Sequence, residues 1–210
     1  MHVNLESTPD RASDLCRAAH QRLLATVAGI SDRQIAAPSR LPGWAVGHLL
    51  THLARNADGH ARRLRGALLG EDLPKYEGGS AQRAQEIDDG AARPAAEIIA
   101  DLHASQSRLE DLFAESSAAG WPNPQRCGGS SYGPRGCPAH RLREVEMHHV
   151  DLGLGYEPVH WPDDYVAWDL DVLLSTVPER LTDPLQRRYL MAWLAGRGPL
   201  PSEVSMAPWG

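Results

Sequence analysis

Carboxylate and imidazole side chains occur at helical spacing in two distant parts of the chain. Glu144 and His148 are four residues apart, so on a helix they lie on the same side, about one turn from each other. His48 and His52 have the same spacing. Helical bundles build metal sites from such side chains, which project inward from facing helices. The spacing therefore indicates a shared metal ion, although a helix-stabilising charge pair is the more common reason for placing Glu144 and His148 in this way.

Helices must bring these residues together, and the sequence predicts four of them. Residues 9–29, 41–70, 94–120 and 139–155 each carry an apolar stripe at the helical period, with Pro near the starts and Gly near the ends. His52 falls on the second helix, and Glu144 and His148 fall on the fourth. Two more amphipathic segments follow at residues 166–181 and 184–193. No segment shows the sustained alternation that is typical of a strand.

These elements predict an all-α fold. We expect a four-helix bundle with a long crossover connection over residues 1–162, and a short helical C-terminal extension over residues 163–210 that packs on it. Residues 71–93 are expected to form a long loop. Residues 120–138 contain four Pro and five Gly, a composition that is incompatible with regular structure. Cys127 and Cys137 lie in this second connection, where two free thiols in a loop are a better interpretation than a redox latch.

The composition excludes several classes of protein. The net charge is −6, with 27 acidic residues interleaved with 21 basic ones, so the chain lacks the basic stripe of a nucleic-acid-binding protein. No stretch approaches the roughly 20 apolar residues that span a bilayer, and the N-terminus resembles no leader segment. Three cysteines do not make the disulfide framework of a secreted miniprotein. We therefore expect a cytoplasmic protein without nucleic-acid or membrane partners.

Two stretches of the chain are similar to the signature sequences of the mycothiol-dependent maleylpyruvate isomerase family, which belongs to the DinB-like metalloenzyme superfamily. They are Leu-Pro-Gly-Trp-Ala-Val-Gly-His-Leu-Leu-Thr-His-Leu-Ala-Arg-Asn-Ala-Asp at residues 41–58 and Arg-Leu-Arg-Glu-Val-Glu-Met-His-His-Val-Asp-Leu-Gly-Leu-Gly-Tyr at residues 141–156. A weaker likeness is found at residues 76–79 with Arg83, and at residues 193–197. The resemblance is continuous over residues 5–162.

The resemblance implies a DinB-like four-helix bundle in which His52, Glu144 and His148 hold a divalent metal, with zinc first among the candidates. Three protein ligands leave room for water or substrate, as in catalytic zinc sites. The resemblance also implies mycothiol as the thiol cosubstrate, which the metal would favour as its thiolate. Because maleylpyruvate is a dianion, the matching candidates for cationic catalytic partners are Arg83 and Arg197.

Other polar residues lie close to the candidate ligands in the sequence. Arg55 and Asn56 follow His52 by one helical turn and are expected to line the pocket that binds the thiol, with a solvated helix face as the alternative. Asp151 is expected to orient a ligand imidazole from behind, as carboxylates commonly do at metal sites. His48 is expected to support the ligands in the same way or to cap its helix.

The function expected from the resemblance is a mycothiol-dependent metalloenzyme. The metal would bind and activate the thiol for addition, transfer or cis–trans isomerisation on a small electrophile such as maleylpyruvate. Isomerases of the family carry a mixed α/β C-terminal domain, whereas the 48 residues after Pro162 are predicted to be helical here, which favours this broader description. An iron-dependent, oxygen-using enzyme with the same ligands is one alternative. A non-catalytic metal- or thiol-binding module in stress response or regulation is another, and the oligomeric state stays open, a homodimer included.

Overall fold

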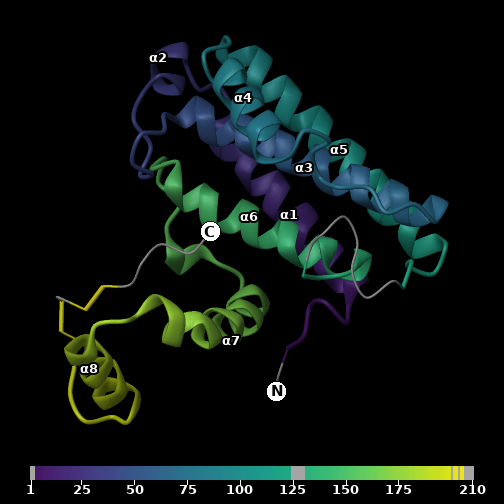
Figure 1. Ribbon diagram of the computed structural model, residues 1–210. Coiled ribbons are helices and arrows are strands. Elements are labelled where there is room, and N and C mark those ends of the chain that lie inside the picture. The colour runs from purple at the N-terminus through teal and green to yellow at the C-terminus, as the bar shows by residue number, and fades with distance from the viewer. Residues whose placement is uncertain (1–2, 124–130, 200, 203, 206–210) are drawn as a thin grey trace. The chain divides into compact units, whose positions relative to one another are not determined.

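A computed structural model of the protein describes residues 3–123, 131–199, 201–202 and 204–205 (Figure 1). Within these residues every regular element is a helix, and the one isolated β-bridge joins Pro38 and Ala45. The all-α prediction is therefore confirmed. None of the described helices combines the length and the hydropathy needed to cross a bilayer. The chain divides into two compact units, residues 3–165 and residues 166 onward.

Four long helices build the first unit: α1 (Pro9–Val27), α3 (Val46–Leu69), α5 (Ala95–Ala118) and α6 (Cys137–Asp151). α5 and α6 each pack against both α1 and α3, so that α1 and α3 occupy opposite corners of the bundle. The connection from α1 to α3 crosses the end of the bundle and contains the short helix α2 (Asp32–Ile35). The apolar stripe predicted for the first helix is buried: Ala12, Cys16, Ala19, Leu23 and Val27.

The boundaries of the predicted helices agree with the structure to within a few residues. The second predicted helix begins later than expected, at Val46, because Gly43 adopts a left-handed φ of 81° and residues 38–45 form a turn before it. α6 begins at Cys137, directly after the 3₁₀ turn Pro134–Gly136, so the end of the predicted irregular connection is helical. A second 3₁₀ turn, Pro158–His160, follows α6.

The connection between α3 and α5 contains a helix that the sequence pattern did not indicate. α4 (Gly79–Ala91) lies where a loop over residues 71–93 is predicted, so that prediction is wrong. The helix has no apolar stripe, and Ile87 is its one large buried hydrophobic residue. Instead α4 approaches α3 closely through small residues: a Cβ added at Gly47 would lie 2.2 Å from the carbonyl oxygen of Ala91.

The second unit is helical, as predicted. α7 (Asp163–Arg180) runs across the boundary between the units, and α8 (Pro184–Leu194) follows it. α8 begins with Asp183, whose side chain accepts hydrogen bonds from the backbone N–H groups of Leu185 and Gln186 and thereby caps the helix.

A buried arginine connects the four long helices of the bundle. Arg141 of α6 donates from Nη1 to the Leu53 carbonyl oxygen and to Asn56 Oδ1, both on α3 and both at 2.9 Å. Its Nε–H donates to His20 Nε2 of α1 at 3.1 Å. Because that nitrogen accepts, the His20 proton sits on Nδ1, which donates to Glu110 Oε1 of α5 at 2.7 Å. This network sets the register of α6 against its neighbours.

The contact between α3 and α4 can be tested at Gly47. Gly47→Ala is expected to lower the free energy of unfolding by about 1–3 kcal/mol, the usual cost of overpacking, because the new methyl group meets backbone. Gly59→Ala in the same helix is the matched control, since the nearest atom to its added Cβ is the Lys75 Cβ at 3.2 Å, a far milder contact than the 2.2 Å to backbone at Gly47. Urea unfolding followed by circular dichroism measures both variants. Equal destabilisation of the two would contradict this packing of α4.

The Arg141 network predicts a pH-dependent contribution to stability from His20. Burial lowers the pKa of His20 to about 4, against the opposing hydrogen bond to Glu110. In the unfolded chain a histidine pKa is about 6.5, so below that pH the unfolded state binds a proton first. The stability that is fully present above pH 6.5 is therefore lost as the pH falls toward 4, by up to about 3 kcal/mol from this group.

The variant His20→Gln keeps a donor and an acceptor but does not titrate. Its free energy of unfolding, measured by urea denaturation at several pH values, should fall less than that of the wild type between pH 7 and pH 4. Parallel pH profiles for the two proteins would show that His20 is not held neutral in the core.

Candidate metal centre

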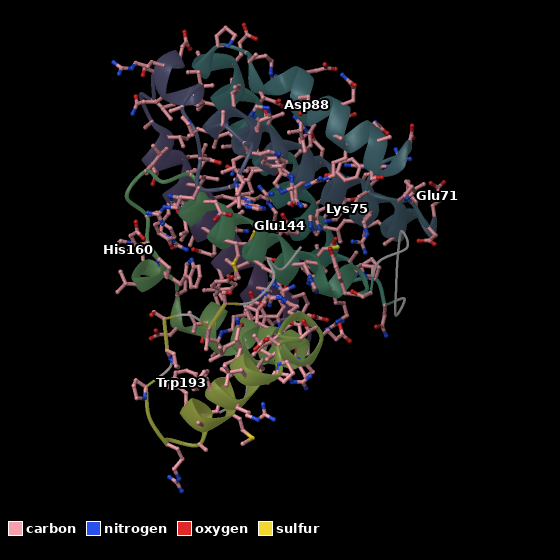
Figure 2. The ribbon with its side chains drawn as sticks, turned by 60° about the vertical axis from the view of Figure 1, so that its left-hand side comes forward. Glu71, Lys75, Asp88, Glu144, His160 and Trp193 are labelled. Atoms are coloured by element: carbon pink, nitrogen blue, oxygen red, sulfur yellow. The ribbon has the colours of Figure 1, made fainter. Side chains whose placement is uncertain are left out.

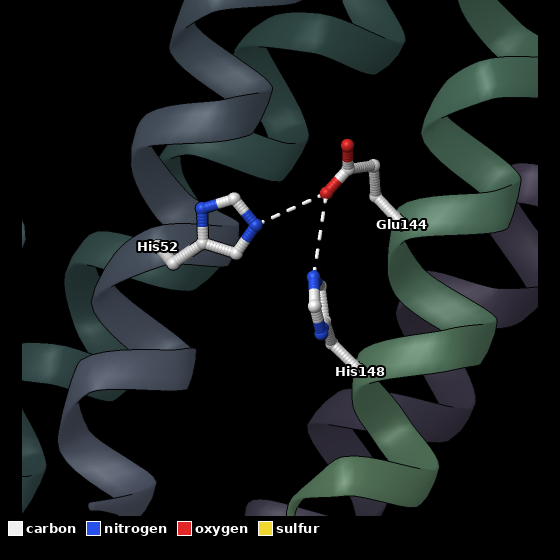
Figure 3. Close-up of side chains that lie close together, drawn as sticks. All are labelled: His52, Glu144 and His148. Atoms are coloured by element: carbon white, nitrogen blue, oxygen red, sulfur yellow. Dashed lines mark hydrogen bonds and ion pairs between the residues drawn. The ribbon is translucent and has the colours of Figure 1, made fainter. Parts of the chain in front are cut away.

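His52, Glu144 and His148 lie together between α3 and α6 (Figure 3). His52 Nε2 is 3.0 Å from Glu144 Oε2, and His148 Nε2 is 3.6 Å from the same oxygen. One potential ligand atom from each residue lies within 4.8 Å of the other two. The fold thus brings two imidazole nitrogens and a carboxylate oxygen from two distant segments to one point.

The local sequence explains how each side chain is positioned. Glu144 and His148 occupy successive turns of α6, and His52 is buried on the side of α3 that faces them. The Trp44 ring packs edge-on against the His52 ring, with centroids 5.7 Å apart. His48 accepts at Nδ1 from the backbone N–H of Ala45 at 3.2 Å. His48 therefore caps α3, which is one of the two roles that we expect for it.

Asp151 and Arg83 contact the outer nitrogens of the two imidazoles. Asp151 Oδ2 lies 2.9 Å from His148 Nδ1. This contact orients the His148 ring so that its Nε2 faces Glu144, as Figure 3 shows for the latter pair. Arg83 Nη2 lies 3.1 Å from His52 Nδ1. Because a guanidinium only donates, His52 Nδ1 is the acceptor, and its proton sits on Nε2 and is donated to Glu144. In this state His52 is neutral and Glu144 is its acceptor.

The charges of the three groups differ. Burial lowers the pKa of His52 to about 4, so this ring is neutral near pH 7. Burial also opposes the charged form of His148, but hydrogen bonds with Asp151 and Glu144 outweigh it and raise the pKa to about 9. Burial likewise opposes ionisation of Glu144, yet the hydrogen bonds with His148 and His52 bring its pKa well below the ordinary value. Without a metal, an imidazolium thus lies between two carboxylates.

The two separations between Glu144 and the imidazole nitrogens fit a metal ion. In a tetrahedral zinc site with bonds of about 2.0–2.1 Å, neighbouring ligand atoms lie about 3.3 Å apart. The two separations in this structure, 3.0 and 3.6 Å, bracket that value. Two imidazoles and one carboxylate are also a common ligand set for zinc and for iron. A metal would have to displace the protons that face Glu144, as is usual when histidine ligands bind.

The other predicted site residues lie in different surroundings. Arg55 is ion-paired with Asp101 at 2.5 Å and lines a cavity of about 320 Å³. Asn56 is buried, and its side-chain oxygen is occupied by Arg141. Arg197 follows α8 in the second unit, where its Nη1–H donates to the Ala195 carbonyl oxygen at 3.2 Å. Of the predicted arginines, Arg83 is the one that contacts a candidate ligand.

Further polar residues near Glu144 are missing from the sequence-based prediction. Lys75, on the connection before α4, is within electrostatic range of Glu144, and both are labelled in Figure 2. His60, on α3, is also within electrostatic range of Glu144. His60 follows His52 by eight residues, and this spacing on one helix face is a signal that points to it. Nothing in the sequence near Lys75 indicates its placement. Cys137 is buried at the start of α6 rather than in a loop, and Cys127 lies outside the described residues.

Comparison with known proteins adds a family to this geometry. Residues 16–153 match the family described as the mycothiol maleylpyruvate isomerase N-terminal domain. The chain matches no curated protein sequence. A crystal structure of the mycothiol-dependent maleylpyruvate isomerase is similar in fold, with a TM-score of 0.70 and 24% identity over 76% of this chain and 67% of that chain. A histidine-to-alanine mutant of that isomerase has the same TM-score and coverage with 23% identity. Because the family match spans well over half of the sequence, the chain belongs to the mycothiol maleylpyruvate isomerase N-terminal domain family.

Proposed function

We propose that the chain is a mycothiol-dependent metalloenzyme that acts on a small electrophile such as maleylpyruvate. In this proposal His52, Glu144 and His148 hold one divalent metal, with zinc first among the candidates. The observation that carries the proposal is the convergence of these three side chains at ligand spacing between α3 and α6, in a chain of this family.

The proposed chemistry is addition and elimination of a thiol. A divalent metal with three protein ligands supplies an open position for the thiol and favours the thiolate, which is the nucleophilic form. The thiolate sulfur adds to the cis double bond of a conjugated acid and leaves a carbon–carbon single bond. Rotation about this bond, followed by elimination of the thiolate, restores the double bond as the trans isomer. The thiol is regenerated, so no other reactant is consumed.

We propose that Arg83 changes its hydrogen-bond partner when a metal binds to the three candidate ligands. In the structure it donates to His52 Nδ1, which keeps the proton of this ring on Nε2. A metal bound at Nε2 needs the proton on Nδ1 instead, where a guanidinium cannot donate to it. Arg83 must then turn away from His52, and a carboxylate of the substrate is the natural new partner for its planar donor group.

The remaining predicted residues keep narrower proposed roles. Arg55 is proposed to contact the thiol because it lines the cavity on the side of α3 and α4. Asn56 is proposed to act through Arg141, whose guanidinium it holds at 2.9 Å, and not by touching the thiol. Arg197 is proposed as a second cationic partner of a dianionic substrate, on the basis of the resemblance alone.

The deciding experiment is turnover of maleylpyruvate by the zinc-loaded protein with mycothiol, with the cis and trans isomers separated by chromatography. Isomer formation that requires both zinc and mycothiol supports the proposal. Saturable mycothiol binding without product from maleylpyruvate or other electrophiles would indicate a non-catalytic binding module. Stoichiometric iron in protein purified without added metal, together with oxygen uptake, would favour an iron-dependent enzyme.

Removal of single ligands tests the metal centre directly. Glu144→Gln and His148→Ala are each expected to lower zinc affinity by more than about 100-fold, because even the loss of an outer hydrogen-bond partner costs about 10–100-fold. Turnover should fall in parallel. His103→Ala, at an exposed position of α5, is the control and should keep both properties. Competition with a chelator measures the zinc affinity. Wild-type zinc affinity in both ligand variants would contradict the proposed metal centre.

The two contacts proposed for Arg83 predict opposite effects of one substitution. Arg83→Met should raise zinc affinity about three- to tenfold, because it removes a charge and a hydrogen bond that favours the wrong tautomer of His52. The same variant should lower kcat/KM for maleylpyruvate, because a cation facing the substrate is lost. Chelator competition and steady-state kinetics give the two quantities. A fall in zinc affinity would mean that Arg83 supports His52 as a ligand instead.

A further inference from the structure

Several polar side chains in the core near Glu144 have nitrogens without a hydrogen-bond partner. Within the described part of the chain, both ring nitrogens of His60 and Nη2 of Arg141 are buried and have no hydrogen-bond partner. The half-buried Lys75 side chain is within electrostatic range of His60 and Arg141. Buried polar groups nearly always have a partner, because leaving one unsatisfied costs about 1–3 kcal/mol. Two such residues beside a lysine point to a ligand that supplies the missing partners.

Lys75 reaches this cluster because its side chain packs against a glycine of α3. Lys75 lies on the connection between α3 and α4, and its side chain packs against Gly59, where an added Cβ would be 3.2 Å from the Lys75 Cβ. Gly59 stands between Asn56 and His60 on α3, so the lysine stem lies along the helix that carries His52.

The charges around this cluster are unbalanced. The charges of Glu144 and Arg141 act on both Lys75 and His60, so the four groups lie within electrostatic range of one another. Arg63, which stacks on the Tyr132 ring at 4.6 Å, adds a further positive charge within range of Lys75. Glu144, which is also the proposed metal ligand, and Asp58 are the carboxylates within electrostatic range of Arg141. The cations Lys75, Arg141 and Arg63 outnumber these two carboxylates, and a bound metal would increase the positive excess.

We propose that Lys75, Arg141 and His60 form an anion subsite that binds a carboxylate group of the electrophilic substrate beside the metal centre. This inference rests on the proposed function for the identity of the substrate, but not for the existence of the subsite. Lys75 and Arg141 supply charged donors, and neutral His60 supplies one N–H. The subsite selects small dicarboxylates, since one carboxylate binds here while the adjacent double bond lies near the metal centre.

The cavity on this side of the bundle provides the approach. Its volume is about 320 Å³, and Lys75 and Tyr76 line it together with Arg55, Gly59, Arg62 and Gln82. The carboxylates of Asp58, Glu77 and Glu86 also line it, so the cationic excess belongs to the inner cluster and not to the cavity as a whole. The Tyr76 ring lies within range of the charges of Arg83 and Arg141 as well as Glu144. Lys75 and Tyr76 are adjacent residues in the cavity lining. Through Tyr76, this part of the lining extends from the proposed subsite toward Arg83, which contacts the candidate ligand His52.

Lys75 is the one lysine among the 210 residues, which allows a test without turnover. The wild-type protein, metal-free and zinc-loaded, is acetylated with a water-soluble reagent in the presence of maleate, and modification of Lys75 is quantified by peptide mass spectrometry. The N-terminal amine is the internal reference. When maleate exceeds its Kd tenfold, acetylation of Lys75 should be about tenfold slower, while the N-terminus is unaffected. Neutral dimethyl maleate should give no protection.

Binding of maleate to variants, measured by calorimetry, provides the second readout. Lys75→Met should weaken maleate binding by about 10- to 100-fold, and Lys75→Arg should restore most of the affinity. Arg65→Met, at an exposed position of α3, is the charge-matched control and should bind like the wild type. Circular dichroism and zinc content show that each variant is folded and loaded.

The outcomes separate this inference from the proposed function. If maleate leaves Lys75 reactivity unchanged in both forms of the protein, or if Lys75→Met binds maleate like the wild type, the subsite is absent even when mycothiol-dependent turnover is found. If maleate protects Lys75 but zinc and mycothiol give no turnover, the subsite stands and the proposed function fails. Protection by sulfate as strong as that by maleate would overturn the selectivity for dicarboxylates.

Discussion

The bundle depends on one buried guanidinium. Arg141 is enclosed by the four long helices and obtains its hydrogen bonds from α3 and α1, with α5 reached through His20 and Glu110. A buried charge that loses such partners destabilises a protein by several kcal/mol, so the helices are constrained to the arrangement that satisfies it. Glu144 lies one turn after Arg141 on α6, and His52 one turn before Asn56 on α3. The network that holds the core therefore also sets the distance between the candidate ligands.

Glu144 is close to two groups of side chains, the candidate metal ligands and a cationic cluster. The two imidazoles offer nitrogens at ligand spacing, with Asp151 and Arg83 behind them. Lys75, Arg141 and His60 are also within its electrostatic range, and Arg141 and His60 carry buried nitrogens without a hydrogen-bond partner in the described part of the chain. The proposed reaction would use this combination, because the thiol nucleophile would need a metal while the carboxylates of the electrophile would need cations.

The comparisons and the geometry support different parts of this interpretation. The family match runs from within α1 to the end of α6 and so includes α3 and α6, which carry the candidate centre, and the likeness to the solved isomerase concerns the fold. The cationic cluster follows instead from contacts within this chain, above all from the close packing of Lys75 on Gly59. α4 contributes Arg83, so the short helix without an apolar stripe becomes part of the site through its approach to α3 at Gly47 and Ala91.

The sequence by itself determined the long helices, because apolar stripes at the helical period and Pro or Gly at the ends are local signals. It also determined that Glu144 and His148 share one face of α6, and the family signatures pointed to His52 as their partner. Only the tertiary structure decided that α4 is a helix, since its stability comes from close contact with α3 and not from a pattern of its own. Only the tertiary structure brought Arg141 to Asn56 and Lys75 to the neighbourhood of Glu144. These approaches join residues far apart in the chain, and their energies depend on burial and charge in the assembled core, which no local pattern records.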